Sequence, residues 1–434
     1  MSMGFVDTVM AGNLSARDLA AVAIGNSLFS PLFLFVMGVL MAINPIVAHL
    51  HGSGERQEIG RGLWQGLWLS QVCAVPVFFI FRNMTPVMRL FDLQPEIIPI
   101  AQGYLNAFSF GLPAAFAYFS LRFFNEGLHI TKPGMYFALI GLLFNIVGNY
   151  VFMYGHLGFR AMGAVGTGWA TALVQWIMFA CMLAFTLRKK SDREFNIFRG
   201  LHLPHWSIQK EILRVGVPNG VSIGIEVSLF AVVALIMGSL GIKTVAAHQV
   251  TINFAAMTFM IPLGLSFATT ARVGFAMGRG DLQQARLLGF ISLGLAVLIM
   301  SVTAFFMMTM PEKIVAIYTR DLQVKNIAVK LLFLAGIFQI SDGLQVMGFG
   351  ALRGLKDTRI PMFVNIFAYW VVGFSLGYYL GIVRGIGAEG LWIGLIAGLT
   401  VAAILHNWRF NRLTSAGGES NSLSAELQEE SAHS

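Results

Sequence analysis

Charged residues are scarce in this sequence. They make up 12% of its 434 residues, about half of the share that is usual in soluble domains. Hydrophobic residues make up 56%, and the mean hydropathy is +0.71. No water-soluble core of this length needs so much apolar surface, so the composition excludes an ordinary soluble domain and predicts a membrane protein.

The common motifs of catalysis and metal binding are also absent. The sequence contains no HExxH, no Walker A lysine loop, no CxxC and no GxSxG. Its two cysteines, Cys73 and Cys181, lie inside apolar runs, where a small buried side chain is the expected role. We therefore predict that the chain is not an enzyme and carries no cofactor.

The net charge of +8 does not indicate a nucleic-acid partner. The basic residues form short clusters between apolar runs and not one continuous basic face. Such clusters are typical of the cytoplasmic loops of membrane proteins. We expect membrane lipids as partners, and no nucleic acid.

Long uncharged runs are the dominant feature of the sequence. A helix in lipid satisfies its own backbone hydrogen bonds, and roughly 20 apolar residues make one crossing. Two such runs, 215–242 and 331–352, are each interrupted by one acid, and residues 1–16 resemble the end of a further helix. Nine runs carry no charge at all: 19–54, 62–81, 97–121, 133–159, 161–187, 244–271, 287–311, 360–383 and 390–408. The sequence predicts an all-α polytopic membrane protein with twelve transmembrane helices, the first one truncated.

The positions of Lys and Arg predict the orientation. Of the 29 basic residues, the even-numbered connections and the C-terminal tail hold 19, seven of them in 188–214, and the odd-numbered connections hold 10. Loops rich in Lys and Arg stay in the cytoplasm. We expect a multi-pass protein of the plasma (inner) membrane with both termini in the cytoplasm.

An internal repeat predicts two halves. A shift of 226 residues places 52–55 (GSGE) on 278–281 (GRGD), and a shift of 227 to 228 places Thr131, Lys132 and Pro133 on Thr358, Arg359 and Pro361. Collinear matches across a whole half predict a duplicated fold, and an even number of helices per half predicts an axis along the membrane normal. The expected parts are an N-terminal six-helix bundle (1–190), a cytoplasmic linker (191–211), a C-terminal six-helix bundle (212–410) and a disordered cytoplasmic tail (411–434).

Three acids interrupt the predicted spans: Asp7, Glu226 and Asp342. One acid at a helix centre costs about 2.5 to 3.5 kcal/mol on insertion scales, and no Lys or Arg lies mid-span to pair with these three. The alternative is an acid neutralised by a neighbour or packed in its protonated form. Since burial penalises a bare charge, we predict that these carboxyl groups exchange a proton, a sodium ion or an organic cation.

Three more residues are candidates because they lie near these acids. Asn145 and Asn149 are four residues apart on one helix face, and their amide oxygens suit a hard cation beside Asp7. Hydrogen bonding between helices is an equally good interpretation. Phe338, one turn before Asp342, would offer its ring to a cationic drug, although core packing is the favoured alternative. The candidate sodium sites are therefore Glu226 with Asp342, and Asp7 with both asparagines.

The whole chain resembles the NorM-type branch of the MATE (multidrug and toxic compound extrusion) family. The resemblance rests on 3–12 (MGFVDTVMAG), on Gly216-Val217-Pro218 with Glu226, on 339–345 (QISDGLQ) with 350–354 (GALRG), and on Asn145 with Asn149. It implies two six-helix bundles forming a V, and a monomer that exports organic cationic drugs and dyes by alternating access. It also implies inward flow of Na⁺ or H⁺ as the driving force, with functional acids at Asp7, Glu226 and Asp342. The sequence leaves the choice between the two ions open.

One departure from the family concerns the first helix. Family members have roughly ten to twenty residues before this motif, as a full span requires. We therefore expect the native start to lie upstream of Met1 and the chain as given to export poorly. A flippase for lipid-linked oligosaccharide is the alternative function, but it would be expected to carry cationic residues in its cavity, and none lies mid-span.

Overall fold

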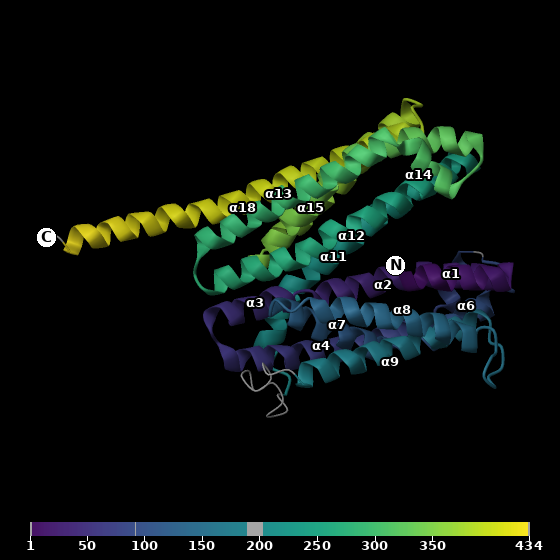
Figure 1. Cartoon of the computed structure of the whole chain (residues 1–434), viewed down its shortest axis with the longest axis horizontal. Coiled ribbons are helices and arrows are strands. Elements are labelled where there is room, and N and C mark those ends of the chain that lie inside the picture. Colours follow the sequence, from purple (N-terminus) through teal and green to yellow (C-terminus); the bar gives the residue numbers. More distant parts are fainter. Residues whose placement is uncertain (1, 92, 189–202, 433–434) are drawn as a thin grey trace. The chain divides into compact units, whose positions relative to one another are not determined.

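The chain folds into helices joined by short connections (Figure 1). The computed structural model describes residues 2–91, 93–188 and 203–432. These residues form two compact units, here called unit 1 (Met1–Val47 and Glu55–Gly220) and unit 2 (Ala48–Gly54 and Val221–Ser434). Two helices, α3 (Ile43–Ser53) and α11 (Trp206–Ser239), contribute one end to each unit.

Unit 1 contains the first half of the helices. Besides parts of α3 and α11 it holds α1 (Ser2–Leu14), α2 (Ala16–Leu40), α4 (Arg56–Arg82), α5 (Thr85–Leu90), α6 (Ile98–Ser109), α7 (Leu112–Gly127), α8 (Lys132–Phe152) and α9 (Ala164–Arg188). α6 and α7 meet at a bend of 48°. Pro113 explains the bend, because proline is tolerated in the first turn of a helix but not in its interior.

Unit 2 contains the second half. Besides parts of α3 and α11 it holds α12 (Ile242–Gly278), α13 (Leu282–Thr309), α14 (Pro311–Tyr318), α15 (Leu322–Gly354), α16 (Arg359–Asn365), η1 (Ile366–Phe374), α17 (Ser375–Tyr378), η2 (Tyr379–Val383) and α18 (Ala388–Ala432). The segments η1 and η2 are π-helical turns within one long helix that runs from α16 to Val383.

The helices are long and apolar enough to cross a membrane. Among the described residues ten helices meet this test, and α6 with α7 adds an eleventh when the bent pair is counted as one span. α1 has 13 residues, which rise only about 20 Å at about 1.5 Å per residue. The predicted all-α polytopic membrane fold is confirmed at this level.

The sequence repeat is visible in the backbone. α4 begins at Arg56 and α13 at Leu282, which is 226 residues later. Gly54 and Gly280, also 226 apart, both have positive φ values of 78° and 73°. His129 and Lys356, 227 apart, share the same unusual conformation, with φ values of 62° and 59°. Since non-glycine residues rarely adopt positive φ, these paired turns indicate a common ancestor of the two halves.

Two glycine-rich helix faces pack together in unit 2. They are Gly373, Gly377 and Gly381 on the η1–η2 helix, and Gly390, Gly394 and Gly398 on α18. A Cβ atom on Gly394 would lie 2.3 Å from the Cα of Gly377, so no side chain fits there. Small residues at four-residue spacing allow membrane helices to approach this closely. The contact brings Tyr369, one turn before Gly373, toward the centre of unit 2, where its side chain is fully buried.

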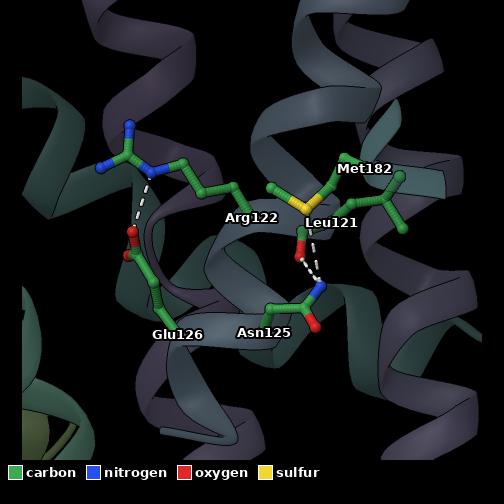
Figure 2. Close-up of polar contacts among 5 residues, drawn as sticks. All are labelled: Leu121, Arg122, Asn125, Glu126 and Met182. Atoms are coloured by element: carbon green, nitrogen blue, oxygen red, sulfur yellow. Dashed lines mark hydrogen bonds and ion pairs between the residues drawn. The ribbon is translucent and has the colours of Figure 1, made fainter. Parts of the chain in front are cut away.

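An ion pair between the half-buried Arg122, whose side chain is 30% exposed, and a buried glutamate lies on α7 in unit 1 (Figure 2). Arg122 Nε donates to Glu126 Oε1 at 2.7 Å, and the Glu126 side chain is only 6% exposed. On the neighbouring face, Asn125 Nδ2 donates to the Leu121 carbonyl at 2.7 Å and lies 3.9 Å from the Met182 sulfur. The uncharged run 97–121 ends just before this pair, whereas α7 continues through both residues to Gly127.

We expect the Arg122→Leu variant to lower the free energy of unfolding by about 3 kcal/mol, because Glu126 then keeps a buried charge without its partner. The double variant Arg122→Leu/Glu126→Leu should recover most of this loss. The measurement is the thermal unfolding of purified protein in detergent. The exposed pair Arg61–Glu58, whose side chains are 51% and 36% exposed, is the control, and its removal should cost less than about 1 kcal/mol. Equal losses for both pairs would contradict a structural role for the buried one.

The ends of the predicted parts differ from the structure. α11 begins at Trp206, inside the predicted linker 191–211, and residues 191–202 lie outside the described ranges. α18 continues to Ala432 and so runs through most of the predicted disordered tail 411–434 (Figure 1).

Candidate functional site

The first acid, Asp7, lies in unit 1 among three polar side chains. Its Oδ1 accepts hydrogen bonds from Asn149 Nδ2 at 2.7 Å and Asn145 Nδ2 at 3.0 Å. Thr171 Oγ1 of α9 approaches Oδ2 at 3.5 Å. The structure therefore brings together all three residues predicted for this site, from α1 and α8, and adds Thr171.

This cluster is closed off from the surface of unit 1. Asp7 is 4% exposed and both asparagines are fully buried. The amide oxygens of Asn145 and Asn149 have no hydrogen-bond partner within the described ranges. Buried polar atoms are rarely left without a partner. Both amides turn their nitrogen atoms toward Asp7 in this structure, so rotation of the two amide groups would be needed to bring their oxygens beside the carboxyl group as ligands for a small hard cation.

α1 is held in place by a contact close to this cluster. Tyr154 Oη donates to the Met10 carbonyl at 2.9 Å, less than one turn from Asp7. Tyr104 lies close enough to Asp7 for an electrostatic interaction, and its hydroxyl donates to Asn26 Oδ1 at 3.0 Å. Asp7 is therefore positioned by side chains from three other helices.

The second group of acids lies in unit 2. Asp342 of α15 is 5% exposed, and Glu226 of α11 lies close enough for the two carboxyl groups to interact electrostatically. Tyr369 interacts with both acids. No Lys, Arg or His forms an ion pair with either acid in the described part of the chain. Two like charges in one buried place favour the binding of a cation or a proton between them.

Phe338 lies in the apolar core of unit 2. It is 2% exposed, and its ring packs edge-on against Trp392 at 5.5 Å and Phe230 at 6.1 Å between centroids. This placement fits the core-packing interpretation better than that of a ring open to a drug. The His248 ring lies 5.8 Å from that of Trp392 between centroids.

Sequence reasoning missed Thr171, Tyr369 and Gln345. Gln345 lies three residues after Asp342, on the same helix face, so its position was available from helix periodicity. Tyr369 is on a different helix, and only the glycine pattern that follows it, Gly373-x-x-x-Gly377, hinted at a close helix contact. Thr171 carried no local signal.

The arrangement of both clusters would suit the binding of cations. No group of three or more His, Cys, Asp or Glu side chains that could hold a metal ion occurs among the described residues. Neither cluster pairs a nucleophile with a base, as an enzyme would require. Each unit instead offers a buried carboxyl centre with neutral oxygen atoms around it.

Known proteins resemble this chain over most of its length. The multidrug resistance protein MdtK of Yersinia pseudotuberculosis is 42% identical over 409 residues, which cover 93% of this chain and 90% of that protein. A MATE crystal structure in the bent conformation is 21% identical, covers 97% of this chain and 92% of its own, and superposes with a TM-score of 0.89. An outward-facing multidrug resistance transporter of the MATE family is 22% identical, covers 96% of this chain and 94% of its own, and has a TM-score of 0.85.

The family model named MatE matches residues 1–151 and 218–379. The matched segments include Asp7, Asn145 and Asn149 in the first half and Glu226, Phe338 and Asp342 in the second. The resemblance found in the sequence is thereby confirmed, as is the prediction that the chain is a transporter and not an enzyme. The chain belongs to the MatE family.

Proposed function

We propose that the chain exports organic cationic drugs and dyes in exchange for Na⁺ or H⁺. The observation that carries the proposal is that Asp7 in unit 1 and Asp342 on the membrane-spanning helix α15 in unit 2 are both buried. Neither acid has an ion-pair partner in the described part of the chain. The name of the 42% identical relative, multidrug resistance protein, supports the substrate class.

The proposed mechanism is competition for the same carboxyl groups. A drug cation and a coupling ion both neutralise a buried carboxylate, so binding of one displaces the other. Exchange becomes directional when the groups face one side of the membrane at a time, as in alternating access. The coupling ion then enters along its gradient and the drug leaves against its own.

We further propose a twelve-helix arrangement. The eleven candidate spans together with α1 give twelve helices, six in 1–190 and six in 212–410. The paired turns at Gly54 and Gly280 support a duplication, and two six-helix bundles related by a pseudo-two-fold axis along the membrane normal follow from it. We expect a monomer, because each chain then carries both halves.

The coupling ion is assigned to two candidate sites. Asp7 with Asn145 and Asn149 would offer three oxygen ligands to Na⁺ once the two amides, whose nitrogens now donate to Asp7, rotate. Glu226 and Asp342 can share one proton or bind one Na⁺. The test is efflux of a fluorescent organic cation from cells that express the chain, with a Na⁺ gradient, a pH gradient or neither. Efflux that needs one gradient identifies the ion, and an absence of efflux under all conditions would overturn the proposal.

The orientation is a separate prediction. The excess of Lys and Arg in even-numbered connections places both termini and the segment 188–214 in the cytoplasm. We expect an epitope tag inserted in this segment to be inaccessible to antibody in intact cells and accessible after permeabilisation. A tag at 157–159, between α8 and α9, is the control and should be labelled from outside. Labelling of the 188–214 tag in intact cells would reverse the orientation.

A further inference from the structure

Several buried polar side chains lie between Asp342 and one end of unit 2, and their polar atoms are not satisfied by close hydrogen bonds. Tyr369 Oη, Gln345 Oε1, both side-chain polar atoms of Asn365 and both ring nitrogens of His406 make no close hydrogen bond within residues 203–432, although Tyr369 faces the Gln345 side chain and His406 faces the backbone of Gln345 and Pro361. None of these four side chains is more than 1% exposed. The acids and cation ligands discussed above do not account for Asn365 or His406.

These residues are arranged from Asp342 toward the end of unit 2 at which α15 ends and α16 begins. On α15, Asp342 is followed by Gln345 and Phe349, which descend about 10 Å toward the C-terminal end of the helix. On the neighbouring helix, Tyr369 and Asn365 are four residues apart and lead to the same end, at which α16 begins. Tyr369 lies beside both acids and beside the Gln345 side chain.

His406 of α18 occupies the next position. Its ring stacks on Phe349, with centroids 5.6 Å apart and planes at 25°, and lies near the backbone of Gln345 and Pro361. One turn further, Arg409 Nε donates to Asp357 Oδ2 at 2.5 Å, with the two side chains 26% and 17% exposed. This ion pair lies where α15 and α16 are joined, and it marks the end of the polar line at the surface.

The other charged groups near this end do not interrupt the line. Arg353 of α15 is buried and turned toward α12, where its Nε donates to Thr270 Oγ1 at 3.2 Å. Arg359 is the first residue of α16 and lies at the surface end. His406 and the Tyr369 phenol are thus the titratable side chains between the acids and the Asp357–Arg409 pair among the residues placed here.

Buried polar atoms without a protein partner are normally satisfied by internal water. Leaving one unsatisfied costs about 1 to 3 kcal/mol, so six such atoms along one line are a strong indication of bound water. A line of water and polar side chains that starts at a buried acid is an arrangement typical of proton pathways in membrane proteins.

We propose that Tyr369, Gln345, Asn365 and His406 line a hydrated proton path between the Glu226–Asp342 pair and the surface at Asp357–Arg409. The inference rests on the proposed function, which supplies protonated acids that must release their proton to one side. His406 passes the proton on by accepting it at one ring nitrogen while the other nitrogen releases a proton to water. With the predicted orientation, this path opens to the cytoplasm.

The presence of water is tested without any transport measurement. Hydroxyl-radical footprinting of the protein in lipid nanodiscs generates radicals from water next to each side chain. After normalisation to the unfolded chain, His406 should be modified about tenfold faster than Phe410, which is equally buried but lies in an apolar cluster. Protection of both residues to the same degree would overturn the inference even if the chain exports drugs.

The role of His406 is tested by transport. His406→Phe keeps the stacking on Phe349 but removes both ring nitrogens, and we expect the rate of gradient-driven efflux to fall about tenfold. His406→Gln keeps polar atoms for water and should retain an intermediate rate. Equilibrium binding of a fluorescent organic cation should be unchanged in both variants, because His406 does not contact the acids.

Thr400→Val is the matched control. Thr400 joins α18 to α15 through a 2.8 Å hydrogen bond with Ser341, so its loss disturbs the same helix pair away from the polar line. This variant should export at the parent rate. Equal efflux by the parent, His406→Phe and Thr400→Val would overturn the proton path while leaving the proposed function intact. A parent protein that exports nothing under any gradient would refute the proposed function, and the footprinting result would then decide the path.

Discussion

Replacing Asp342 by asparagine is expected to abolish gradient-driven efflux while the protein still folds and inserts. The amide has nearly the same shape as the carboxyl group, but it carries no charge and cannot release a proton. Asp342 has no ion-pair partner in the described part of unit 2, so the substitution leaves no uncompensated charge behind. We expect the rate of efflux to fall by about a hundredfold or more, as for the loss of an essential proton-transfer group.

Glu226→Gln should have the same effect, because the two acids act on one cation. The measurement is efflux of a fluorescent cation from cells with equal amounts of inserted protein, determined by immunoblotting of the membranes. Glu389→Gln is the control in the same unit, since Glu389 is exposed and pairs with Lys330 at 3.3 Å on the surface. Parent rates in both Asp342→Asn and Glu226→Gln would show that these acids do not carry the exchange.

The second large effect is expected for Asp7→Asn in unit 1. The substitution replaces the charged centre of the cluster by a third amide, and the site then has no charge to attract a cation. We expect efflux to fall by about tenfold or more and the remaining activity to lose its dependence on one coupling ion. The measurement is the initial efflux rate over a range of Na⁺ concentrations and pH values. A smaller amount of inserted protein lowers all rates in proportion, whereas loss of coupling removes the dependence of the rate on the ion.

The asparagines test whether the cluster acts as one site. Asn149→Ala removes the shorter of the two hydrogen bonds to Asp7, at 2.7 Å against 3.0 Å for Asn145. Each single variant should weaken the dependence of the efflux rate on the coupling ion. Adding either asparagine variant to Asp7→Asn should cause no further change in the efflux rate. Glu96→Gln is the control, because this acid is 68% exposed in a surface pair with Arg17. Additive losses in the double variants would contradict a shared cation site.

The helices could be predicted because lipid imposes a simple constraint on them. A span must be long and apolar, and every uncharged run in the second half of the sequence matches a helix of the structure. The ends of helices were less predictable. The uncharged run 97–121 stops at Arg122, whereas pairing with Glu126 on one helix face allows both charged residues to lie inside α7.

The two cation clusters were predictable to different degrees. Asp7, Asn145 and Asn149 could be proposed as a group because helix periodicity places both amides on one face, although their contact with α1 required the fold. Tyr369 and His406 could not be found, because their positions depend on how the η1 helix and α18 pack against α15. The glycine faces that create this packing are plain in the sequence, but a spacing of four does not identify the partner helix.

The most direct test of the account is drug exchange by the purified protein in liposomes. Liposomes that contain the chain are loaded with a fluorescent organic cation, and a gradient of Na⁺ or of pH is then imposed across the membrane. We predict that one gradient drives rapid release of the cation by the parent protein. Protein with Asp342→Asn or Glu226→Gln should release it no faster than empty liposomes. Protein with Asp7→Asn should release it either at that same low rate or at a rate that does not depend on the gradient. Release that is equally fast without any gradient, or that is unaffected by all three substitutions, would contradict cation-coupled export through these acids.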